Sequence, residues 1–347
     1  MNVAKALAII AVVVGHTDPP IFSIIYNYHM ALFFFIMGYL YKDNDSREPW
    51  MLVKKRLRSL YLPFVRFNLL FLLFHNLFFF IFLYSDQVNF NGTVVREYTS
   101  ADLMENAVKI LFFKNTEQLV GVLWFLRTLF LVNVVFCLIR FAGLMLLKRY
   151  EQFTAIAVLV LFAIGVLMSL RKDIVSAEMA RAFVSLFIFY LGFLYRRSES
   201  VVPMKAVFAI GFGALFVLLS SYGTVMLVYV GLVNPAFFVA ASILGIYVNI
   251  YLAKTIARTR AVVFFDYLGQ QTLVVLAFHL LAFKIITWLQ VIVQDQPLYK
   301  IASFPVLSGA HGWWIVYTMA GLLVPLLLLQ LRNGMRNLIW KPKTALP

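Results

Sequence analysis

The sequence predicts an all-α, multi-pass membrane protein, a bundle of about ten transmembrane helices with both termini on the cytoplasmic side. The first observation is composition: the 347 residues are 63% hydrophobic and 13% charged, whereas a soluble domain is about 25% charged. The second is a mean hydropathy of +0.89. Since so little charge cannot cover a soluble protein of this size, both a water-soluble enzyme and a disordered chain are disfavoured.

Ten apolar stretches approach the roughly 20 residues that a membrane-spanning helix needs. No soluble domain or linker interrupts them, so we expect residues 1–347 to form one integral-membrane domain. The region 182–253 also admits other divisions into helices. The ten stretches are 3–20, 22–41, 60–84, 119–139, 154–170, 182–195, 206–222, 229–253, 268–292 and 313–331.

The third observation is the placement of charge, which sets the predicted orientation. Lys and Arg gather in alternate connections, such as 42–58 and 254–260, while the connection 86–117 carries the acidic residues. This is the positive-inside pattern, with Arg171 and Lys172 as exceptions. Because the basic residues are spread over many loops and form no single patch, the net charge of +15 indicates topology, and we expect no nucleic-acid partner.

The first stretch carries a notable pair of ionisable residues, Lys5 and His16. Ionisable side chains at membrane depth are costly, so each is a candidate functional residue. Eleven residues at about 100° each return to within about 20° of the starting direction, and the side chains lie about 16 Å apart along one helix face. Taken alone, Lys5 also fits a lysine that extends to the headgroups, and His16 a helix-end histidine.

Another histidine, His29, follows the turn Asp18-Pro19-Pro20 and opens the second stretch. His16 and His29 are therefore expected at similar depth on adjacent antiparallel helices. An imidazole titrates near neutrality and suits general-base catalysis on a hydroxyl. No carboxylate or further histidine has ligand spacing with this pair, so we expect no metal site.

The stretch 268–292 carries a polar stripe, with Thr272 and His279 seven residues apart on one face. Lipid cannot satisfy these side chains, so the stripe is expected to point into the bundle. A hydrogen bond between helices is the simpler interpretation of His279.

Two other features are candidate binding elements. The cation-rich segment 54–63 contains Arg56 and Arg58, whose forked guanidinium groups bind phosphate; attraction of a basic loop to anionic lipid is the alternative. No glycine-rich phosphate loop accompanies it, so neither ATP nor NAD is implied. Trp124 and Arg127 offer an aromatic face and a cation to a sugar ring or an acyl donor, unless the tryptophan is an interface anchor.

These features occur together, in this order, in the bacterial membrane acyltransferase-3 family, which the chain resembles over nearly its whole length. The nearest branch is that of the sugar O-acetyltransferases, which includes fucose 4-O-acetylase-like proteins. Lys5 stands where many members have arginine. The matching blocks are Lys5 and His16 with ten residues between them, His29 through Tyr39, the basic segment ending in Pro63, Trp124-Phe125-Leu126, and Gly269 through His279.

The resemblance implies an O-acyltransferase of the bacterial inner membrane that moves an acetyl group from cytoplasmic acetyl-CoA to a hydroxyl of an envelope glycan or lipid-linked sugar. We expect His16 to be the general base or the nucleophile, Lys5 to orient the donor, and His29 to assist His16 or contact the acceptor. The expected donor-binding residues are Lys55, Arg56 and Arg58, and the expected acceptor-pocket residues are Tyr39, Trp124, Arg127, Thr272 and His279.

Two alternative functions remain open at this point. A proton-coupled transporter of a small solute would also place histidines inside a helical bundle, although the internal repeats typical of transporters are not evident. A transferase for succinyl or another acyl group would differ only in a few pocket side chains. The expected partners are membrane lipid and the glycan; the sequence specifies neither the acceptor sugar nor the oligomeric state.

Overall fold

The computed structural model describes residues 1–90, 93–170, 174–227 and 234–339. Within these ranges the chain is helical apart from loops and one hairpin of two short strands, β1 (Asn89–Phe90) and β2 (Thr93–Val94). The α-helices are α1 (Asn2–Gly15), α2 (Phe22–Tyr26), α3 (His29–Tyr39), α4 (Pro49–Arg56), α5 (Leu62–Leu73), α6 (His75–Phe80), α7 (Ser100–Leu111), α8 (Trp124–Leu146), α9 (Tyr150–Ser169), α10 (Ile174–Ser198), α11 (Ala206–Tyr222), α12 (Pro235–Ile256), α13 (Val262–Gln270), α14 (Thr272–Val293) and α15 (Trp313–Ile339).

Seven helical stretches in the described ranges are long and apolar enough to cross a membrane, which fits the predicted all-helical membrane protein. Helices α1 and α11 are apolar but shorter. The predicted count of about ten spans and the predicted orientation stay predictions. Arg171, Lys172 and the start of the predicted stretch 229–253 lie outside the described residues. The seven stretches are Phe22–Tyr39, Gln118–Leu146, Tyr150–Ser169, Ala177–Ser198, Pro235–Ile256, Thr272–Val293 and Ala310–Gly334.

The predicted stretch 22–41 is broken between α2 and α3. Asn27 holds the break, because its side-chain amide donates to the carbonyl oxygen of Gly223 (2.9 Å) and its side-chain oxygen accepts from the backbone N–H of Val225 (2.7 Å). A hydropathy pattern cannot predict contacts with a segment about 200 residues away in sequence. The break makes His29 the first residue of α3.

The predicted stretch 60–84 is also divided. A π-helical turn over Leu57–Tyr61 joins α4 to α5, just before Pro63. Proline has no N–H to donate to the carbonyl four residues earlier, and its ring crowds that carbonyl, so a wider turn relieves the conflict. At its other end the stretch breaks again at Phe74, between α5 and α6.

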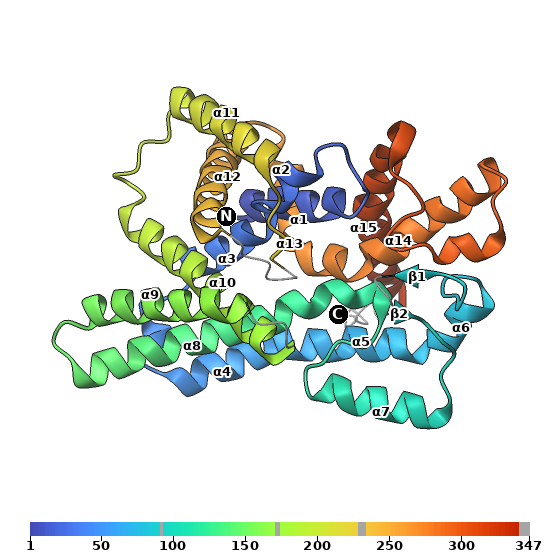
Figure 1. Ribbon diagram of the computed structural model, residues 1–347, viewed down its shortest axis with the longest axis horizontal. Coiled ribbons are helices and arrows are strands. Elements are labelled where there is room, and N and C mark those ends of the chain that lie inside the picture. The colour runs from blue at the N-terminus through green and yellow to red at the C-terminus, as the bar shows by residue number, and fades with distance from the viewer. Residues whose placement is uncertain (91–92, 171–173, 228–233, 340–347) are drawn as a thin grey trace, which may run out of the picture.

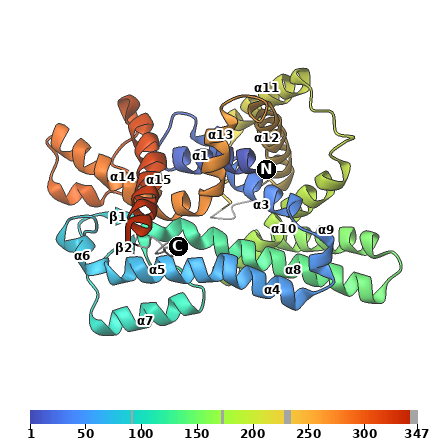
Figure 2. The same ribbon diagram turned by 180° about the vertical axis from the view of Figure 1, so that it is seen from behind.

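Figures 1 and 2 show the arrangement from opposite sides: α4, α5, α8 and α9 lie side by side, and α1, α11, α12, α13, α14 and α15 lie across from them. Helices α3 and α10 pack between the two groups. At this contact Gly38 faces the backbone of Phe189 and Gly192 faces that of Phe35, and a Cβ on either glycine would overlap a carbonyl oxygen. Small residues of this kind let membrane helices approach closely.

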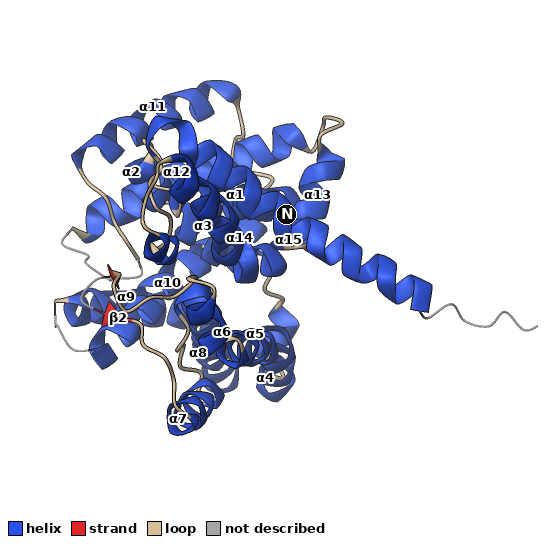
Figure 3. Ribbon diagram, turned by 90° about the vertical axis from the view of Figure 1, so that its right-hand side faces the viewer, coloured by secondary structure: helices blue, strands red, loops and turns tan. Residues whose placement is uncertain are grey.

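The C-terminal half of α15 projects away from the other helices (Figure 3). Its N-terminal half packs on α14 and α1, so it is this half that contributes to the interior. The buried hydrophobic core draws most heavily on α1, α3, α8, α10 and α14.

Candidate active site

A cavity of about 1170 Å³ lies inside the bundle. Its wall is formed by α1, α2, α3, the start of α8, the ends of α13 and α14 that face each other, and the segment 304–308. Five of the sequence-predicted site residues line it, from four of the matching blocks: Lys5, His16, His29, Trp124 and Thr272. The blocks that are scattered over residues 5–272 thus meet at one cavity.

Lys5 and His16 mark two ends of this cavity, because both belong to the same face of α1 and are about 16 Å apart along its axis. Near Lys5 the wall includes Gly269 and Gln270, since α13 packs against the start of α1 and the Asn2 amide donates to Asp266 (2.9 Å). Near His16 the wall includes Asp18, Tyr26 and Ser308. We call these the Lys5 end and the His16 end.

The histidines share one hydrogen-bonding pattern. The Nδ1 atom of His16 lies 2.7 Å from the carbonyl oxygen of Val12, and that of His29 lies 2.8 Å from the carbonyl oxygen of Ile25. A carbonyl can only accept, so each Nδ1 carries the hydrogen, and in the neutral ring Nε2 holds the lone pair. His16 and His29 therefore meet the cavity as bases with a fixed ring orientation.

His279 lies behind His16 and does not line the cavity. It is fully buried, its ring centroid is 5.3 Å from that of His16, and its Nδ1 is 3.0 Å from the carbonyl oxygen of Val275. Among the residues that the structure describes, its Nε2 has no hydrogen-bond partner. The predicted inward direction of the polar stripe is confirmed for both members, with Thr272 at the cavity wall and His279 one layer deeper.

Trp124 lines the cavity, but Arg127 does not. Arg127 instead makes a bidentate ion pair with Glu178 of α10, with N–O distances of 2.7 and 2.6 Å. The cation next to Trp124 is Arg181, whose guanidinium carbon lies 4.7 Å from the ring centroid. Sequence reasoning missed Glu178 and Arg181, although two opposite charges three residues apart in an apolar helix are a usable signal.

The predicted donor-binding cations lie beside the cavity and are not among its lining residues. Arg58 is exposed and directly precedes Ser59, which does line the cavity. Lys55 pairs with Asp45 (3.6 Å). Arg56 is buried, and this burial lowers the pKa of its guanidinium while the charge of Asp45 opposes the effect. Tyr39 points elsewhere and donates to Glu199 (2.5 Å), so it too is outside the cavity wall.

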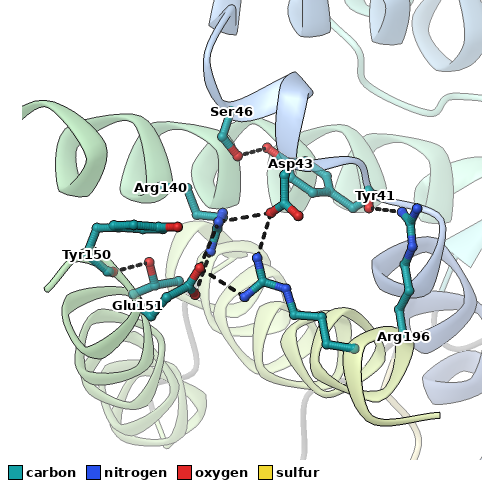
Figure 4. A network of polar contacts seen from close by, with 9 residues as sticks. Tyr41, Asp43, Ser46, Arg140, Tyr150, Glu151 and Arg196 are labelled. Atoms are coloured by element: carbon teal, nitrogen blue, oxygen red, sulfur yellow. Dashed lines mark hydrogen bonds and ion pairs between the residues drawn. The ribbon is translucent and has the colours of Figure 1, made fainter. Parts of the chain in front are cut away.

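A second group of arginines, near the ends of α8 and α10, is neutralised by acidic residues (Figure 4). The buried Arg140 pairs with Asp43 (3.0 Å) and Glu151 (2.9 Å), and Arg197 pairs with the same two carboxylates (2.8 and 2.9 Å). These contacts tie the segment after α3 to α8, α9 and α10. Their charges are compensated, so they offer less to an anionic ligand than the exposed Arg58.

The side chains in the cavity suit proton transfer and binding more than metal chemistry. In the described part of the chain, no group of three or more His, Cys, Asp or Glu residues is placed to hold a metal ion. The wall combines histidines with aromatic rings, as at Phe22, Tyr26 and Phe33. Polar groups that sequence reasoning overlooked are Gln118 and Ser308, which lie in connections outside the predicted apolar stretches.

Comparison with protein families supplies the deciding observation: the model of an acyltransferase domain, acyltransferase-3, matches residues 1–330. The chain belongs to the acyltransferase-3 family. The match covers every motif that lines the cavity, from Lys5 to Ser308. As an acyltransferase-3 protein the chain is a membrane acyltransferase. Comparisons with curated proteins and with solved structures each returned no match.

Proposed function

We propose that the protein is an O-acetyltransferase that moves an acetyl group from cytoplasmic acetyl-CoA to a hydroxyl of a cell-envelope glycan or lipid-linked sugar. The observation that carries the proposal is the cavity itself, which joins Lys5 and His16 over about 16 Å of one helix face. A donor that enters at the Lys5 end and an acceptor that enters at the His16 end can meet inside it. An acyltransferase acting on substrates from two sides of a membrane needs this arrangement.

The chemistry centres on Nε2 of His16, whose lone pair is set by the Nδ1 hydrogen bond to Val12. Nε2 removes the proton of the acceptor hydroxyl as its oxygen attacks the thioester carbonyl. The new C–O bond forms, the C–S bond breaks, and the departing thiolate takes the proton back from the imidazolium. His16 thus returns to its neutral state, and His29, with the same ring geometry, assists it or contacts the acceptor.

At the donor side, the exposed Arg58 and Lys55 supply positive charge for the phosphates of CoA. Ser59 connects this segment to the cavity wall, so the pantetheine arm can follow the wall inward past Lys5. The volume of about 1170 Å³ exceeds the roughly 300–1,000 Å³ usual for a small-molecule site, which suits two substrates together. Lys5 then orients the donor along α1.

At the acceptor side, the wall offers aromatic faces with a few polar groups between them. Trp124, which lines the cavity, is held by Arg181, and Tyr26, Asp18 and Ser308 lie at the His16 end. Aromatic faces bind the apolar face of a sugar ring, and hydroxyl and carboxylate groups bind its hydroxyls. Together with the positive-inside pattern, this supports an acceptor on the outer side of a bacterial inner membrane.

The experiment reconstitutes the purified protein in vesicles and supplies radiolabelled acetyl-CoA on one side and a soluble sugar acceptor on the other. The proposal expects labelled acceptor only when the donor is on the face that carries Arg58. A His16→Asn protein serves as the catalytic control. Wild-type protein that consumes no acetyl-CoA from either side, in any lipid tested, would contradict the proposal.

A further inference from the structure

The membrane-spanning helix α14 contains a buried lysine, Lys284, that the predicted chemistry does not use. Only 2% of its surface is exposed, and no carboxylate pairs with it in the described ranges. Its ammonium donates instead to the carbonyl oxygens of Ile301 (3.2 Å) and Ser303 (2.6 Å). Because a lysine inside a membrane helix is costly, its presence at this place points to a role.

Two other buried side chains hold the same connection. Gln290 of α14 donates to the carbonyl oxygen of Ser308 (3.2 Å) and accepts from the hydroxyl of Tyr317 of α15 (2.7 Å). The Tyr317 hydroxyl oxygen also accepts from the backbone N–H of Leu307 (3.4 Å). Lys284, Gln290 and Tyr317, which we call the loop clamp, thus fix the backbone of the segment 301–308 at four points.

This segment forms the wall of the cavity at the His16 end. Its residues 304–308 all line the cavity. Gly309, which follows them, packs so closely on the turn after His16 that a Cβ there would overlap the carbonyl oxygens of Thr17 and Asp18. A displacement of the segment would therefore reach the turn that carries His16.

We propose that the loop clamp is a set of positioning residues that holds the segment 304–308 in place as the acceptor-binding wall. None of the three side chains lines the cavity, so they act on the substrate through the segment. The inference rests on the proposed acetyl transfer. On this inference, the affinity for the acceptor depends on Lys284 and Tyr317. The affinity for the donor, which enters at the opposite end of the cavity, does not depend on them.

The kinetic test compares Lys284→Met and Tyr317→Phe with wild type in the reconstituted acetyl-transfer assay, varying donor and acceptor separately. The expected result is an acceptor KM raised about tenfold, the equivalent of about 1.4 kcal/mol, with the acetyl-CoA KM unchanged. The matched control is Lys300→Met, because Lys300 is in the same connection but donates to Gln296 and not to the segment. Equal loss for donor and acceptor, or no change in either variant, would overturn the inference.

A second measurement does not depend on activity. Ser308→Cys places a thiol on the segment, and the natural Cys137 is buried. Maleimide labelling of that thiol is expected to accelerate at least severalfold when Lys284→Met or Tyr317→Phe is added, while labelling of Leu298→Cys, at an exposed site, stays constant. Unchanged labelling at position 308 would contradict the clamp even if acetyl transfer were confirmed. If wild type proved inactive while labelling accelerated, the proposed function alone would fail.

Discussion

Replacing His16 by asparagine removes the group on which the proposed chemistry depends. Asparagine keeps a polar side chain of moderate size but has no basic nitrogen, so the acceptor hydroxyl loses its proton acceptor. General-base catalysis contributes about 10²–10⁴-fold, equivalent to about 2.7–5.5 kcal/mol, and we expect kcat to fall by that factor. The effect on folding is smaller, since one hydrogen bond to the Val12 carbonyl is exchanged or lost, about 0.5–1.5 kcal/mol.

The assay is acetyl transfer at saturating acetyl-CoA, normalised to folded protein by size-exclusion profile and thermal unfolding. His311→Asn is the matched control, because His311 is exposed and does not line the cavity. Donor alone, followed by acid quench and peptide mass spectrometry, is expected to leave His16 unmodified; an acetyl group on it would reassign it as the nucleophile. A folded His16→Asn protein with a rate within about twofold of wild type would refute the assignment of His16.

Three further outcomes follow from the geometry. Arg58→Gln is expected to raise the KM for acetyl-CoA about tenfold with little change in kcat, and to make that KM less dependent on salt. The control is Lys148→Gln, because Lys148 is also exposed. An unchanged KM in Arg58→Gln would show that Arg58 does not bind the donor. Arg140→Gln breaks the ion-pair network in Figure 4 and is expected to lower the free energy of unfolding by about 2–3 kcal/mol, while activity per folded molecule persists. Thermal unfolding measures the effect, with Arg149→Gln as the control. Equal stability of the two variants would show that the ion pairs of Arg140 do not stabilise the fold. Gly38→Ala places a Cβ against the Phe189 carbonyl and is expected to lower the yield of folded protein. Gly211→Ala is the control, because a Cβ at Gly211 meets nothing within 4 Å and should leave the yield unchanged. Equal yields of the two variants would contradict the close contact between α3 and α10.

Much of the site could be predicted because helical geometry is regular. The 11-residue spacing of Lys5 and His16 places both on one face of any α-helix, and the structure finds both at the wall of one cavity. The tight turn at Asp18 likewise brings His29 to the same space. These inferences needed only local rules.

The remaining features depend on contacts between distant segments. Nothing near Arg127 in the sequence indicates that Glu178 neutralises it, nor that Arg181 takes the place next to Trp124. The segment 304–308 belongs to a connection without periodicity. Its place beside His16 is set by Lys284 and Gln290 from the preceding helix α14 and by Tyr317 from the following helix α15. The break at Asn27 and the π-helical turn before Pro63 have the same kind of cause, because side-chain contacts and ring sterics override hydropathy.

The most direct test of acetyl transfer to an envelope sugar is the mass of the envelope glycan from a strain that lacks this protein. The account predicts that the glycan loses the mass of one acetyl group per modified residue, that wild-type protein restores it, and that the His16→Asn protein does not. An unchanged glycan in the deletion strain, with every lipid-linked precursor also unchanged, would contradict it.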